Sequence, residues 1–307
     1  MDQGRDGKPE RLAGRPVAGA RARSRATLIG FGAVLLWALL ALFTVGSAPV
    51  PPFQLNAICF AIGGALGLIW IAATGGGLGF VRAVPWPVWA LGVGGLFGYH
   101  ALYFAALRLA PPAQAGLIAY LWPLLIVLFS GLLPGETLRR GHVLGAILAF
   151  AGAALIVARG AGAADPGALP GYALAFLCAL TWSGYSVLSR RAGGVPTQAV
   201  ALFCLAAAGL SLIVHLAVED TVWPVAPIGW AAMAGLGAGP VGLAFYLWDI
   251  GVKRGDIQLL GTASYAAPLL STLVLIAAGI AAPHPALIAA AILIAGGAAL
   301  AARAARA

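Results

Sequence analysis

The sequence predicts an all-α membrane protein with ten transmembrane helices in two inverted five-helix repeats. Three observations support this fold class. The 307 residues are 62% hydrophobic and 9% charged, with a mean hydropathy of +0.97, whereas soluble domains carry about 25% charged residues. Ten apolar runs are each long enough to cross a bilayer, and one residue pattern occurs twice, 145 residues apart. A surface this apolar would precipitate in water, so we expect the chain to be surrounded by lipid.

The ten runs are each about 20 residues long, which is the length of a helix that crosses the hydrocarbon core. They are rich in Leu, Ala and Gly and do not alternate, so they predict helices and not the roughly 10-residue strands of a barrel. In the first copy they are Leu28–Gly46, Phe53–Ala73, Trp86–Leu107, Ala113–Leu133 and Val143–Ala158. In the second copy they are Ala168–Leu188, Thr197–Ala217, Ile228–Ile250, Ile257–Ile280 and Pro285–Ala302.

The duplication is visible in rare residues that keep one register. The matched pairs include Trp37 with Trp182, Cys59 with Cys204, Tyr120 with Tyr265, and Pro123 with Pro268. We therefore assign residues 27–160 to the first repeat and residues 168–303 to the second. Because each copy holds five spans, the second copy enters the membrane from the opposite face. Secondary transporters use this arrangement, with the substrate site between the repeats.

Basic residues predict the orientation. If the N-terminus is cytoplasmic, all but two of the 18 Lys and Arg residues lie on the cytoplasmic side, and the two exceptions are Arg108 and Arg159. Cytoplasmic loops carry such an excess. We therefore expect a multi-pass protein of the cell inner membrane with both termini in the cytoplasm. Residues 1–26 are expected to be a disordered, basic cytoplasmic tail. The net charge of +9 sits in this tail and at the ends of apolar runs, which argues against a nucleic-acid partner.

Polar aromatic side chains inside the spans are the first candidates for a substrate site. Steps of three and four residues share one helix face, so Tyr99, His100 and Tyr103 are expected on one side of the third span. Such groups are costly against lipid and are expected to face the bundle interior or a cavity. For aromatic residues near the middle of a span, a position in a cavity is favoured over a position in the interfacial aromatic belt. The candidates are Tyr99, His100, Tyr103, Trp122, Trp182, Tyr185 and Tyr246.

Two prolines interrupt the fourth and ninth spans. Pro123 has no N–H to donate to the carbonyl of Ala119, and Pro268 leaves the carbonyl of Ser264 without its usual donor. A carbonyl freed at membrane depth lines a cavity or finds another partner, and the sequence leaves both possibilities open. In a cavity it would accept a hydrogen bond from a substrate ammonium group. Pro123, Ser264 and Pro268 therefore join the candidates.

The spans carry few charges. None has a carboxylate near its middle, and Asp249 lies at the inner end of the eighth run. A proton-coupled exporter of cationic drugs needs a membrane-embedded acid, so the sequence favours a facilitator that runs down the gradient of its substrate. His100 and Asp249 remain alternative proton sites. The sequence contains no metal-binding or phosphate-binding motif, so no cofactor or metal is expected, and the three cysteines are interpreted as packing residues.

The spans and their aromatic and proline positions resemble a known family. Ten spans in two copies, with Trp37 and Trp182 in the first span of each and Pro123 and Pro268 in the fourth, resemble the EamA-type drug/metabolite transporter superfamily over about residues 28–302. Within it, Tyr99-His100 and Trp122-Pro123 are similar to the YddG-type aromatic amino acid exporters. The resemblance implies export of aromatic and other neutral amino acids. We expect a monomer whose partners are this small-molecule substrate and the lipid bilayer.

Two alternatives stay open at this point. The first is an exporter of drugs or other small metabolites, with or without proton coupling. The second comes from a different class, an intramembrane enzyme or a structural membrane partner. The repeat itself suggests where to look, because Tyr99, His100 and Trp122 align with Ala244, Phe245 and Ala267 in the second copy. The first copy thus holds most of the unusual polar aromatic groups.

Overall fold

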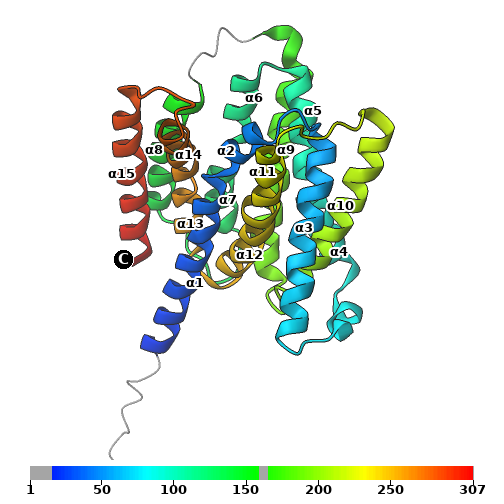
Figure 1. The fold of residues 1–307 in the computed structure, drawn as a ribbon. Helices are drawn as coiled ribbons and strands as arrows, with labels where there is room; N and C mark the ends of the chain where they lie inside the picture. The colour runs from blue at the N-terminus through cyan, green and yellow to red at the C-terminus, as the bar shows by residue number, and fades with distance from the viewer. Residues whose placement is uncertain (1–15, 159–164, 307) are drawn as a thin grey trace, which may run out of the picture.

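The computed structural model describes residues 16–158 and 165–306, and every regular element in these ranges is a helix (Figure 1). Within the described ranges, ten helical segments are long and apolar enough to cross a membrane, which confirms the predicted fold class. They are Gly19–Gly46, Pro52–Ala73, Trp86–Leu109, Pro112–Ser130, Arg140–Val157, Pro166–Arg191, Ala199–Val218, Pro227–Arg254, Ile257–Ala277 and Ala286–Ala305.

The spans of the first repeat are built from eight helices and one π-helical segment. They are α1 (Pro16–Trp37) with α2 (Leu40–Gly46), α3 (Pro52–Ala73), α4 (Trp86–Val93) with the π-helical segment Gly94–Gly98 and α5 (Tyr99–Leu109), α6 (Pro112–Ala119) with α7 (Trp122–Ser130), and α8 (Arg140–Val157). A short 3-10 helix, Leu78–Ala83, lies between the second and third spans.

The second repeat follows the same order. Its elements are a 3-10 turn (Pro166–Ala168) with α9 (Leu169–Arg191), α10 (Ala199–Val218), α11 (Pro227–Ala238) with the π-helical segment Gly239–Leu243 and α12 (Ala244–Arg254), α13 (Ile257–Ala263) with α14 (Ala266–Ala277), and α15 (Ala286–Arg306). The two π-helical segments start 145 residues apart, so the repeat extends to irregular backbone. The interruptions predicted at Pro123 and Pro268 are confirmed, because the helix stops and restarts just before each proline.

The first helix begins earlier than the sequence predicted. Residues 16–26, expected to belong to a disordered tail, form the first turns of α1. Arg23 accounts for part of this order, because its Nη2 lies 3.1 Å from Glu136 Oε2 and 3.7 Å from Asp256 Oδ2. The prediction of disorder is therefore wrong for residues 16–26, and the rest of the expected tail, residues 1–15, lies outside the described residues.

Helices pack in the pairs that a two-fold relation between the repeats requires. Two helices pack on their own repeat counterparts: α3 packs on α10, and α8 packs on α15. The other two pairs, α1 with α12 and α9 with α5, are counterparts of each other. Small residues permit the α1–α12 approach: a Cβ on Gly30 would lie 2.8 Å from the Cα of Gly251. The same crossing in the other pair is made by Ala175 and Ala106, which are fully buried in one cluster.

The two ends of the bundle differ. We call the end where α1 begins and α15 ends the termini end, and the opposite one, which holds the loop between α2 and α3, the far end (Figure 1). Near the termini end, α7 packs on α9 and α13. The counterparts of α7 and α13 are α14 and α6, and these two are not closely packed in the described part of the chain. One end of the interface between the repeats is thus closed and the other is not.

Candidate substrate-binding site

A cavity of about 730 Å³ lies between the repeats. Its walls come from α1, α2, α3, α5 and α14, and the loop residues Ala48, Pro49 and Val50 line it at the far end. Sites for small ligands range over roughly 300–1,000 Å³, so the cavity suits a single small molecule. Among its lining residues, all within the described ranges, none is Asp, Glu, Lys or Arg. The site therefore carries no formal charge, and its mostly apolar lining holds a few polar groups.

Four tryptophans pack together at the inner limit of the cavity, and we call this group the tryptophan floor. Three of them, Trp37, Trp122 and Trp182, line the cavity, while Trp248 is fully buried behind them. Trp37, Trp122, Trp182 and Trp248 come from α1, α7, α9 and α12, and every pair of their ring centroids is between 5.1 and 6.3 Å apart. The Nε1 of Trp37 donates to the carbonyl of Pro240 at 3.1 Å, and the Nε1 of Trp248 donates to Ser186 Oγ at 3.0 Å. This tryptophan floor places broad aromatic faces at the inner limit of the cavity.

An ionic layer seals the bundle beneath the floor. Arg190 Nη1 donates to the carbonyls of Val252 at 2.9 Å and Gly255 at 2.8 Å, and its Nη2 contacts Glu136 Oε1. The Glu136 side chain is only 6% exposed, and its other oxygen pairs with Arg23. These contacts join α1, α9 and the loops that follow α7 and α12. The cavity is therefore closed toward the termini end and reaches the far end.

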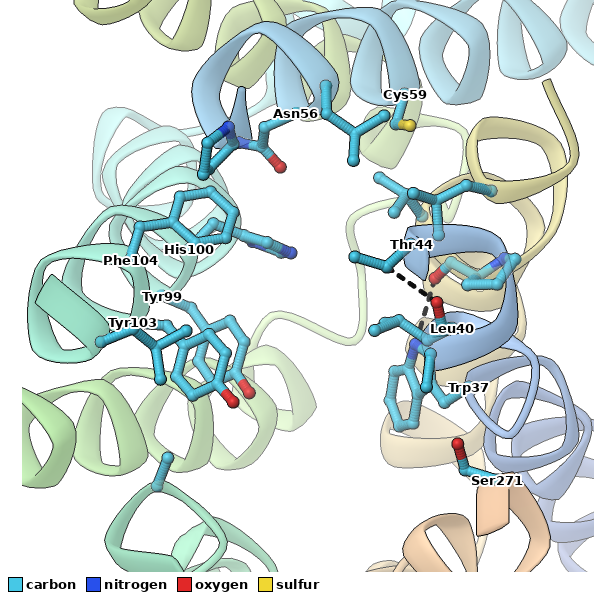
Figure 2. A pocket seen from close by; sticks show the side chains of 18 of the residues that line it. Trp37, Leu40, Thr44, Asn56, Cys59, Tyr99, His100, Tyr103, Phe104 and Ser271 are labelled. Carbon is cyan, nitrogen blue, oxygen red and sulfur yellow. Dashed lines mark hydrogen bonds between the residues drawn. The ribbon is translucent and has the colours of Figure 1, made fainter. Parts of the chain in front are cut away.

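The α5 wall carries the polar aromatic groups. His100 Nδ1 lies 2.7 Å from the carbonyl oxygen of Leu96, within the π-helical segment. A carbonyl only accepts hydrogen bonds, so Nδ1 carries the proton and Nε2 of the neutral ring is an acceptor. The rings of Tyr99 and Tyr103 stack at 6.2 Å with an interplanar angle of 6°, and both hydroxyls point into the cavity (Figure 2).

Asn56 on α3 is a polar lining residue that sequence reasoning missed. Its Nδ2 donates to Ser211 Oγ at 2.8 Å, and Ser211 in turn donates to the carbonyl of Ala207 at 2.7 Å. The amide oxygen of Asn56 points into the cavity (Figure 2). The available signal was an amide in a mostly apolar run, and Gln54 two positions earlier carries the same signal, so the sequence alone did not single out Asn56. Other lining residues outside the candidate set include Trp37, Thr44, Phe104 and Ser271.

Five of the sequence candidates line the cavity, and five do not. Those that line it are Tyr99, His100, Tyr103, Trp122 and Trp182. Pro123 is buried one position beyond Trp122, where it restarts the helix. Tyr185 packs beneath the floor, with its ring centroid 5.3 Å from that of Trp182. Neither Pro123 nor Tyr185 is part of the cavity surface.

Tyr246, Ser264 and Pro268 also lie outside the cavity surface. The Tyr246 hydroxyl donates to the carbonyl of Gly63 at 2.8 Å and so joins α12 to α3. The expectation that the Ser264 carbonyl lacks a donor is wrong, because the N–H of Ala267 donates to it at 3.0 Å. A tight turn between α13 and α14 supplies this bond one position before Pro268, so the proline leaves no free acceptor there.

An inverted ten-span bundle with an uncharged cavity between its repeats, sealed at one end, has the architecture of a membrane transporter. The chain belongs to the EamA-like transporter family, whose model matches residues 24–158 and 169–303. This match confirms the resemblance read from the sequence and the choice of a transporter over an enzyme.

Named relatives and a solved structure agree with the family. The chain is 58% identical over 281 residues to the aromatic amino acid exporter YddG of Ancylobacter novellus, covering 91% of this chain and 97% of that protein. It is 26% identical over 263 residues to the exporter of the same name from Salmonella typhimurium, covering 81% and 86%. A crystal structure 57% identical to this chain matches it with a TM-score of 0.88, over 93% of this chain and 100% of the other.

Proposed function

We propose that this protein exports aromatic and other neutral amino acids from the cytoplasm across the cell inner membrane. The observation that carries the proposal is the uncharged cavity above a tryptophan floor. A zwitterion has no net charge and needs no ionic partner, and an aromatic side chain would stack on Trp122 and Trp182. The names of the relatives support the same substrate class. One chain completes the cavity, which supports a monomer as the working unit.

Transport runs down the gradient of the substrate. Asp249, the carboxylate nearest to the tryptophan floor in sequence, is 3% exposed and pairs with Lys253 at 2.9 Å. Thr197 Oγ1 donates to its other oxygen at 2.7 Å. A carboxylate held in this way is poorly placed to exchange protons with a substrate. This supports a facilitator and disfavours a proton-coupled exporter.

Alternating access follows from the inverted repeats. If each repeat adopts the conformation of the other, the packing of α7 on α13 is lost and that of α14 on α6 is gained. The cavity would then open toward the termini end. The distribution of Lys and Arg supports a cytoplasmic termini end, so the conformation described here faces outward.

Uptake into proteoliposomes tests the proposal. Labelled phenylalanine, labelled threonine and the lipophilic cation tetraphenylphosphonium are offered with and without a pH gradient. We expect both amino acids to enter without the gradient and to stop at equal concentrations on the two sides. If only the cation moves, and only with the gradient, both the amino acid substrate and the facilitator mechanism are excluded.

A further inference from the structure

We infer that Asn56 Oδ1 and His100 Nε2 form the subsite that binds the ammonium group of the substrate. The inference rests on the proposed function, since it takes the substrate to be an amino acid. It adds the direction in which the amino acid lies in the cavity, and it assigns a role to Asn56, which lies outside the candidate set read from the sequence.

The hydrogen bonds behind Asn56 determine which end of its amide faces the cavity. Ser211 is fully buried and has a single hydroxyl proton, which it donates to the carbonyl of Ala207 at 2.7 Å. Toward Asn56 it is therefore an acceptor, so the group 2.8 Å away must be the amide nitrogen. The amide oxygen is left on the cavity side, where no described protein group donates to it.

The backbone behind His100 sets its ring in a similar way. Because Nδ1 donates to the Leu96 carbonyl, the nitrogen that points into the cavity, Nε2, is an acceptor (Figure 2). The Phe60 ring, 5.2 Å from the imidazole in an edge arrangement, supports the ring from α3. Both cavity-facing atoms are thus acceptors, and each is held by a bond on its hidden side.

Two convergent acceptors select a cation. An ammonium group carries only donors, whereas a carboxylate carries only acceptors and would be repelled at this wall. Phe104 lines the same wall, with its ring centroid 6.2 Å from that of His100, and aromatic faces attract cations within about 6 Å. The carboxylate is then directed toward the hydroxyls of Tyr99 and Tyr103, and the side chain toward the tryptophan floor.

Competition with two fragments of phenylalanine tests the inference. 2-Phenylethylamine keeps the ammonium group, and 3-phenylpropionate keeps the carboxylate. Inhibition of labelled phenylalanine uptake is measured for each fragment in proteoliposomes with the wild type and with Asn56→Leu. We expect Asn56→Leu to weaken inhibition by phenylethylamine about tenfold or more, the change that corresponds to one lost hydrogen bond to a charged group. Inhibition by phenylpropionate should stay unchanged.

Two further variants test orientation and guard against misfolding. Asn56→Asp places a carboxylate at the same position, so phenylethylamine should inhibit more strongly than in the wild type. Ser211 lies outside the cavity, and Ser211→Ala removes both the acceptor that orients the amide and the donation to the Ala207 carbonyl. It should weaken inhibition by phenylethylamine in the same direction as Asn56→Leu, but by less. Ser183→Ala is the matched control, because Ser183 is also fully buried and donates to the carbonyl four residues back, Ala179, at 2.8 Å.

The outcomes separate the inference from the proposed function. If phenylalanine is transported but Asn56→Leu weakens both fragments equally, or neither, the ammonium subsite is wrong while the proposed function stands. The same holds if Asn56→Asp fails to strengthen inhibition by phenylethylamine. If the wild type does not transport phenylalanine at all, the proposed function itself is wrong.

Discussion

Lys253 Nζ donates to the carbonyl of Val195 at 3.0 Å and thereby fastens α12 to the loop before α10 at the sealed end. The repeat counterparts of these residues are Arg108 and Val50, at the far end. There Val50 lines the cavity, and the Arg108 side chain is 53% exposed beside Glu219. If the repeats exchange conformations, Arg108 should reach the Val50 carbonyl when the cavity opens toward the termini end.

This relation predicts a shift in cross-linking. Cysteines at positions 50 and 108, in a chain without the three native cysteines, should be joined slowly by a short bifunctional thiol reagent. Lys253→Ala weakens the sealed end and so raises the population of the opposite state, which should speed the cross-link. Arg254→Ala is the control, because that side chain is exposed. An unchanged rate in Lys253→Ala would argue against exchange between the repeats.

Trp122→Ala should impair transport of aromatic substrates more than transport of small ones. The indole of Trp122 forms part of the tryptophan floor, and aromatic contacts contribute about 0.5–1.5 kcal/mol beyond area burial. We expect KM for phenylalanine to rise several-fold more than KM for threonine. Trp86→Ala is the control, since Trp86 is 78% exposed and does not line the cavity. Equal effects on the two substrates would contradict a stacking role.

Glu136→Ala should lower stability. The variant leaves Arg190 without its carboxylate partner in the ionic layer beneath the tryptophan floor. Removing one member of a buried ion pair costs roughly 3 kcal/mol or more. We expect the loss of stability to lie near the lower end of this range. Glu136 also pairs with Arg23, whose side chain is 44% exposed, and a solvent-exposed partner contributes little. Thermal unfolding in detergent measures the change in Tm. Asp165→Asn, at an exposed position, should leave Tm unchanged.

Tyr246→Phe should cost stability without changing substrate affinity. The variant removes the hydroxyl that donates to the carbonyl of Gly63 at 2.8 Å, a bond between α12 and α3 outside the cavity. Loss of a buried hydrogen bond costs about 1 kcal/mol. KM for phenylalanine should match the wild type while Tm falls. A raised KM with an unchanged Tm would show instead that Tyr246 contacts the substrate.

The fold was largely readable from the sequence because its signals are local. Span length, composition and the matched pair Trp37 and Trp182 require no knowledge of packing. The start of α1 was not readable, since Arg23 is ordered by Glu136 and Asp256, which are distant in sequence. Only the tertiary structure brings these charges together.

The candidate site was readable in part. Tyr99 and Trp122 were found because polar aromatic groups inside a span must face protein or a cavity. Polarity and position within a span do not separate them from Tyr185 and Tyr246. Tyr185 packs against Gly95, and Tyr246 bonds to Gly63, so both face other helical segments instead of the cavity. Asn56 carries the weakest signal in sequence, and only its bond to Ser211 shows which way its amide points.

Counterflow of phenylalanine shows whether the cavity between the repeats carries an amino acid by alternating access. Proteoliposomes are preloaded with unlabelled phenylalanine and diluted into a trace of labelled phenylalanine. We expect a transient accumulation of label above its equilibrium level, and a much smaller one with Trp122→Ala. No accumulation with the wild type, in vesicles that hold correctly folded protein, would contradict transport by alternating access.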